Sequence, residues 1–133
     1  IEVFHKILKS GCKAVDAKLR TAQRLENLIS VFCILSWRVF WMTMMNRATQ
    51  SESPKLALTE MEITLLDNLV RDTGRIPAGP KALPHYLTKI ARLGGYLARA
   101  SDPPPGNKVM WKGLTRLMDI ELGAIIGARL MGN

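Results

Sequence analysis

Residues 22–46 read AQRLENLISVFCILSWRVFWMTMMN, and this stretch sets the character of the whole chain. Between Leu28 and Met45 its only charged side chain is that of Arg38. Thr21 directly precedes the stretch, and a threonine hydroxyl there can accept a hydrogen bond from a backbone N–H of the first helical turn. The pattern therefore predicts one long helix over the quoted residues.

Two environments suit so apolar a helix, a membrane and the core of a folded domain. A charged residue near the centre of a membrane span costs about 2.5–3.5 kcal/mol, and Arg38 occupies that position. Three hydroxyl groups weaken the apolar case further, at Ser30, Ser36 and Thr43. We therefore expect a buried central helix, and a membrane span is the alternative.

The rest of the chain also favours helices. Hydrophobic residues make up 47% of the 133 residues and aromatic ones only 6%, a balance that suits helices better than sheets. Thr59 and Glu62 have the spacing of a capping box, which predicts a helix start at Glu60. The predicted elements are helices over about 1–8, 60–72, 84–100 and 108–130, and a rigid connector at 102–106. Residues 12–18 are compatible with one short strand in an otherwise all-α fold.

Basic side chains are concentrated in two parts of the chain. The net charge is +8, and residues 1–48 hold eight basic and three acidic side chains, whereas residues 71–108 hold seven and two. Such blocks attract polyanions, so the charge favours nucleic acid or an acidic membrane surface, with a merely soluble basic surface as the alternative. Cys12 and Cys33 are spaced neither as a zinc site nor as a redox pair, and we expect two free thiols in a cytosolic protein.

The first predicted helix carries the richest set of chemical groups. Glu2 and Lys9 are seven residues apart and nearly eclipse on a helix, with His5 and Lys6 between them on the same side. A carboxylate flanked by ammonium groups suits a site where a metal ion is held beside a phosphodiester. A solvated helix face with ordinary intrahelical ion pairs explains the same pattern.

These residues resemble a known signature. The run IEVFHKILKSG, residues 1–11, is similar to the region around the third acidic residue of DDE transposases of the insertion-sequence-four and transposon-five type. That signature is a tyrosine, two residues, an arginine, three residues, a glutamate, six residues and a lysine. Glu2 and Lys9 match its last two members, and the tyrosine and arginine would precede Ile1. Residues 90–96 (IARLGGY), 105–106 (PG) and 111–117 (WKGLTRL) resemble the dimerisation domain of the same family.

The resemblance implies a division of the chain and a chemistry for its parent enzyme. Residues 1–20 would end an RNase H-like catalytic domain, and residues 21–133 would form a helical C-terminal dimerisation domain. Two aspartates and Glu2 would hold Mg²⁺ or Mn²⁺ for cleavage and strand transfer at transposon ends. Lys9 would grip a phosphate, with further DNA contacts from Lys6, His5 and Lys13. A cytoplasmic, nucleoid-associated bacterial protein, working as a homodimer on DNA without a membrane, is the expectation.

The last predicted helix carries the candidate dimer contacts. Small residues line one strip, at Gly123, Ala124, Gly127 and Ala128, and the apolar Leu114, Leu117, Ile125 and Leu130 lie beside it. Such a strip lets two helices approach closely, although it can equally pack within one chain. Two other functions stay open, a sequence-independent DNA-binding module that tracks phosphates and a small membrane protein. The DNA module would use a set of basic residues, Lys6, Lys9, Lys13, Lys18, Arg20 and Arg24.

One carboxylate does not make a two-metal site, so we expect the purified chain to lack cleavage activity at transposon ends and to need no cofactor. The measurement is incubation of labelled transposon-end DNA with the chain and Mg²⁺ or Mn²⁺. Metal-dependent nicking that disappears in Glu2→Ala would contradict this expectation.

Overall fold

The computed structural model describes residues 2–7, 9, 18, 20–48, 52–72 and 81–132. In these residues it contains five α-helices, one short 3₁₀ helix and no strand, which confirms the all-α expectation. The elements are α1 (Glu2–Lys6), α2 (Ala22–Ala48), η3 (Pro54–Leu56), α3 (Glu60–Leu69), α4 (Leu83–Leu93) and α5 (Asn107–Leu130). The strand considered for residues 12–18 falls almost entirely outside the described residues.

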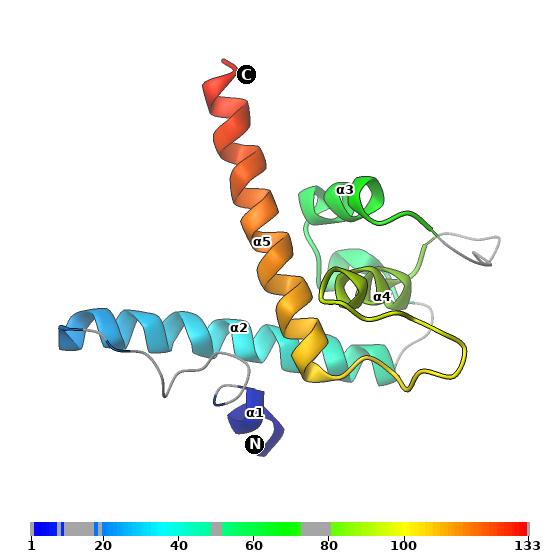
Figure 1. Ribbon diagram of the computed structural model, residues 1–133, viewed down its shortest axis with the longest axis horizontal. Coiled ribbons are helices and arrows are strands. Elements are labelled where there is room, and N and C mark those ends of the chain that lie inside the picture. Colours follow the sequence, from blue (N-terminus) through cyan, green and yellow to red (C-terminus); the bar gives the residue numbers. More distant parts are fainter. Residues whose placement is uncertain are drawn as a thin grey trace.

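The two long helices cross, and the shorter ones pack around the crossing. Figure 1 shows α5 rising across α2, with α3 and α4 on one side of α2 and α1 on the other. Helix α4 packs most extensively on α5, and their contact forms the centre of the core. The core contains Leu66 of α3, apolar residues of α4 and three large side chains of α5, namely Met110, Leu114 and Leu117.

Helix α2 is buried along one side only. Four residues of its inner face are buried, namely Ser36, Val39, Met42 and Thr43. Large apolar side chains remain exposed on its outer side, including Ile34, Trp37, Trp41 and Met44. We expected a buried central helix, and only one side of α2 is buried because, among the described elements, only α1 lies beyond α2 on the side away from α3 and α4 (Figure 1). Helix α2 is also long and apolar enough to cross a membrane by length and composition.

Arg38 reaches from this apolar helix into the body of the protein. Its Nη2 donates to both carboxylate oxygens of Glu62, at 2.6 and 2.7 Å, and to the carbonyl of Ala57 at 3.3 Å. Only 2% of the Glu62 side chain is exposed, so this carboxylate depends on protein partners. The same carboxylate accepts a hydrogen bond from the backbone N–H of Thr59, whose hydroxyl accepts one from the backbone of Glu62. The predicted capping box is thus confirmed.

Two helices end earlier than the sequence predicted. Helix α4 ends at Leu93, whereas we expected it to continue to Ala100. Gly95 has φ +99°, and the N–H of Tyr96 turns back to bond the carbonyl of Ala91, which closes the last turn. Helix α3 ends at Leu69 instead of residue 72, because the chain becomes extended at Val70.

A close approach of α4 and α5 requires two glycines. A Cβ on Gly94 would overlap the carbonyl oxygen of Val109, and one on Gly113 would overlap the carbonyl oxygen of Ile90. Because backbone atoms cannot move away as a side chain can, both positions exclude any larger residue at this helix separation.

The C-terminal half of α5 extends away from the other helices. Figure 1 shows its last turns beyond the rest of the molecule. We call residues 119–130 the α5 arm. A Cβ added at Gly123 or Gly127 in this arm would meet no atom within 4 Å. The arm therefore contrasts with the N-terminal half of the same helix, where Gly113 is tightly enclosed.

The buried pair of Arg38 and Glu62 should contribute strongly to stability. Arg38→Met removes the cation and leaves a buried carboxylate without it, so we expect a loss of about 2–4 kcal/mol in the free energy of unfolding. Urea denaturation followed by circular dichroism measures this loss. Lys55→Met is the matched control, because Lys55 and Glu60 form an equally short but exposed pair, and its stability should hardly change. Equal losses in the two variants would contradict the role given to burial.

Candidate functional site

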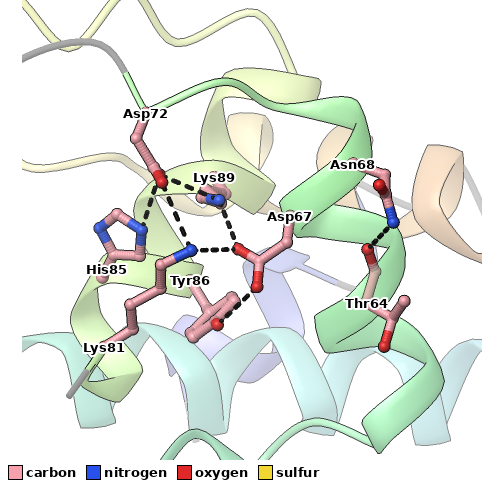
Figure 2. A network of polar contacts seen from close by, with 8 residues as sticks. All are labelled: Thr64, Asp67, Asn68, Asp72, Lys81, His85, Tyr86 and Lys89. Atoms are coloured by element: carbon pink, nitrogen blue, oxygen red, sulfur yellow. Dashed lines mark hydrogen bonds and ion pairs between the residues drawn. The ribbon is translucent and has the colours of Figure 1, made fainter.

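The densest group of charged residues lies where the end of α3 meets the start of α4. Figure 2 shows six side chains converging there: Asp67, Asp72, Lys81, His85, Tyr86 and Lys89. Asp67 Oδ1 accepts from Lys81 Nζ at 2.8 Å and from Lys89 Nζ at 2.7 Å. Asp67 Oδ2 accepts from the hydroxyl of Tyr86 at 3.0 Å. We call this group the polar cluster.

Asp72 forms the second acidic centre of the polar cluster. Its carboxylate lies 3.0 Å from the ammonium of Lys89 and 3.4 Å from that of Lys81. His85 Nε2 is 2.9 Å from Asp72 Oδ1, a short distance without the angles of a hydrogen bond. His85 and Lys89 are four residues apart on α4, so one face of the helix presents both groups. Lys81 and Lys89 therefore form ion pairs with both carboxylates of the cluster.

The pKa values of three ionic groups in the polar cluster, Asp67, Asp72 and Lys81, are shifted in the direction that favours their charged forms. Burial tends to raise the pKa of Asp67, but hydrogen bonds from Lys81, Lys89 and Tyr86 outweigh it and lower this pKa to about 2. The ammonium of Lys89 holds the pKa of Asp72 below its ordinary value, and hydrogen bonding to Asp67 raises that of Lys81. Asp67, Asp72 and Lys81 are therefore charged near neutral pH.

The polar cluster connects the end of α3 to the start of α4 through ion pairs, which is a structural role rather than a catalytic one. Each carboxylate is occupied by lysine ammonium groups, and only 4% of the Lys89 side chain is exposed. No group of three or more His, Cys, Asp or Glu side chains that could hold a metal ion occurs among the described residues. The sequence reasoning missed this cluster, although lysine and histidine at 81, 85 and 89 repeat at the four-residue spacing of one helix face.

The residues predicted to lie near the catalytic centre are on or beside α1. Glu2, His5 and Lys6 are exposed on this five-residue helix, and Lys9 is exposed just after it. Lys13 lies outside the described residues. A divalent ion needs several oxygen ligands, and Glu2 supplies one carboxylate. Among the described residues Glu2 belongs to no group of three or more side chains that could hold a metal ion.

The residues predicted for dimerisation divide between two environments. Leu114 and Leu117 are buried, at 1% and 0% exposure, and pack within the chain. This differs from their predicted place at a dimer contact, because both side chains belong to the hydrophobic core. The small residues behave differently: Gly123 and Ala128 are exposed, and Ala124 and Gly127 are half-buried.

An apolar ridge, of which the sequence reasoning named only Leu130, lies on the α5 arm. We call Leu122, Ile126 and Leu130 the apolar ridge, and they are 57%, 47% and 82% exposed. Their spacing of four residues places them along one side of the helix. In a single copy of the chain, the described residues leave about half or more of each of these side chains exposed to solvent. The spacing itself was the signal that could have identified Leu122 and Ile126.

Neither a scan against protein-family models nor a search of curated proteins gives a match to this chain. The resemblance to DDE transposases therefore rests on the runs quoted above, chiefly Glu2 with Lys9 and the two segments around Gly94 and Trp111.

The polar cluster should make stability depend on acid pH. The pKa of Asp67 is lowered from its ordinary 3.8 to about 2, so its stabilisation is complete above pH 4 and is lost as the pH falls toward 2. Because one-third of this side chain is exposed and water screens its charge, the contribution is on the order of 1 kcal/mol. We expect Asp67→Asn to be less stable than the parent at neutral pH and to converge with it as the pH falls.

Urea denaturation at a series of pH values measures this convergence. Glu52→Gln is the control, because Glu52 is exposed and its side chain has no hydrogen bond or ion pair among the described residues. A stability difference between Asp67→Asn and the parent that is the same at every pH would rule out the ionic role of Asp67.

Proposed function

We propose that this chain is the C-terminal part of a cut-and-paste DNA transposase and that it joins two copies of the enzyme through the α5 arm. The observation that carries the proposal is the apolar ridge, three large exposed side chains on a helix that extends beyond the body. Covering such side chains releases about 25 cal/mol for each Å² of apolar surface, so a second protein surface there is favoured.

The glycines of α5 support a contact with another molecule. Gly113 is needed for packing within the chain, since a side chain there would strike the backbone of α4. Gly123 and Gly127 have no such role, because a Cβ at either would meet open space. Glycine in a helix interior costs up to about 1 kcal/mol relative to alanine, and a close approach by a second helix would explain why that cost is accepted.

Glu2 and the outer side of α2 fit the same proposal. In the parent enzyme Glu2 would share Mg²⁺ or Mn²⁺ with two aspartates of the catalytic domain, and this chain would have no nuclease activity by itself. Helix α1, which carries Glu2, packs on α2. The exposed apolar side chains of α2 are then the surface that the catalytic domain would cover, rather than a membrane span. Arg38, paired with Glu62, favours the protein environment.

The α5 arm should control self-association. Ile126→Glu places a charge in the centre of the apolar ridge, so we expect the dissociation constant to rise by about tenfold or more. Sedimentation equilibrium over a concentration series measures the constant. Leu56→Glu is the matched control, because Leu56 has a similar exposure of 56% on a different surface.

Gly123→Leu tests the contribution of the small residues separately. The added side chain has room in the monomer, so the fold is retained and any loss of association reports on the contact between copies. Unchanged association in Gly123→Leu would remove the small residues from the interface. If Ile126→Glu also associates like the parent, the α5 arm is not the interface.

A sequence-independent DNA-binding module is the second candidate, because Lys18, Arg20 and Arg24 are all exposed around the start of α2. Binding of this kind would weaken steeply with salt and ignore base sequence. The absence of any retardation of DNA by the chain at low salt would eliminate this candidate.

A further inference from the structure

The α5 arm carries a second pattern, which includes charges. Asp119, Leu122, Ile126 and Arg129 follow one another at spacings of three, four and three residues. At 100° per residue all four lie within about 80° around the helix axis, on the side roughly opposite to the buried Leu117. All four are exposed. We call these four residues the α5 seam, and their spacing is that of the contact line between two paired helices.

The two ends of the α5 seam have opposite charges. Asp119 begins it and Arg129 ends it, with two apolar residues between them. Among the described residues neither of the two side chains has a hydrogen bond or ion pair, so both are available to another molecule. A molecule that binds along the α5 seam must therefore present apolar groups to Leu122 and Ile126, a cation to Asp119 and an anion to Arg129.

The α5 seam of a second copy, running antiparallel to the first, presents these groups in this order. If two α5 helices pair antiparallel, Asp119 of one copy lies beside Arg129 of the other, and Leu122 lies beside Ile126. If they pair parallel, each aspartate faces an aspartate and each arginine an arginine, which is repulsive. Charge complementarity therefore selects both the occupant and its direction.

We propose that a second copy of this chain binds antiparallel along the α5 seam, with Asp119 of each copy paired to Arg129 of the other. This inference rests on the proposed function and adds the direction and register of the contact. The arrangement has two-fold symmetry, so each ion pair and each apolar contact occurs twice. Asp119 and Arg129 are ten residues apart, about 15 Å along the helix.

The symmetry sets the expected strength of this contact. Two large apolar residues from each copy cover a short seam, much less than a standard interface of about 800 Å² per partner. Association through the seam alone is therefore concentration-dependent, and the two ion pairs contribute to direction as much as to affinity. Gly123 borders the seam and places no side chain between the helices.

Charge reversal tests the direction. In the antiparallel seam, Asp119→Lys brings a lysine beside Arg129 at two places, and Arg129→Glu brings two carboxylates together. We expect each single variant to associate about tenfold more weakly than the parent. The double variant, Asp119→Lys with Arg129→Glu, restores opposite charges at both places and should associate like the parent. Sedimentation equilibrium at low salt measures all four, and circular dichroism checks that each is helical.

The outcomes separate this inference from the proposed function. Recovery in the double variant supports the antiparallel seam. Single variants that match the parent, or a double variant no better than the singles, overturn it. If Ile126→Glu still prevents association in that case, self-association through the α5 arm stands and only the direction is wrong. If the parent chain stays monomeric at every concentration, both proposals fail.

Discussion

The ion pair between Arg38 and Glu62 is the constraint that orients the longest helix. Arg38 lies in an otherwise apolar segment of α2 and must find an anion when that segment enters a protein core. Glu62 supplies it while also bonding the backbone N–H of Thr59 at the start of α3. One carboxylate thus fixes which side of α2 faces inward and where α3 begins, because both hydrogen bonds must be made at the same time.

Helix α3 is held by charges at both ends. Glu62 ties its first turn to α2, and Asp67 ties its last turns to lysines that precede and follow the start of α4. Leu66, between them, has no exposed surface. A helix of ten residues has little stability of its own, so its position depends on these tertiary contacts. Most of the other contacts in the core are apolar, and the polar ones are concentrated on this short element.

Local signals in the sequence predicted the helices well, and long-range contacts account for what they missed. The capping box at Thr59 and the start of α2 after Thr21 depend on residues three or four positions apart, which sequence reasoning can read directly. The end of α4 required knowing that Gly95, one of two adjacent glycines, takes positive φ. The pairing of Arg38 with Glu62 joins residues 24 positions apart, and the hydrogen bonds of Asp67 in the polar cluster join residues 14 to 22 positions apart, so no local pattern contains them. Two of the candidate dimer residues, Leu114 and Leu117, belong to the buried core of the chain, which their spacing in the sequence does not reveal.

Helix α5 is continuous from Asn107 to Leu130, yet its first half contributes to the core whereas its arm carries large exposed apolar side chains. Substitutions in the first half must preserve the contact at Gly113, whereas Gly123 and Gly127 in the arm have open space for a side chain. If the arm pairs two copies as proposed, a few substitutions on it would be enough for two related chains in one cell to stop forming mixed assemblies.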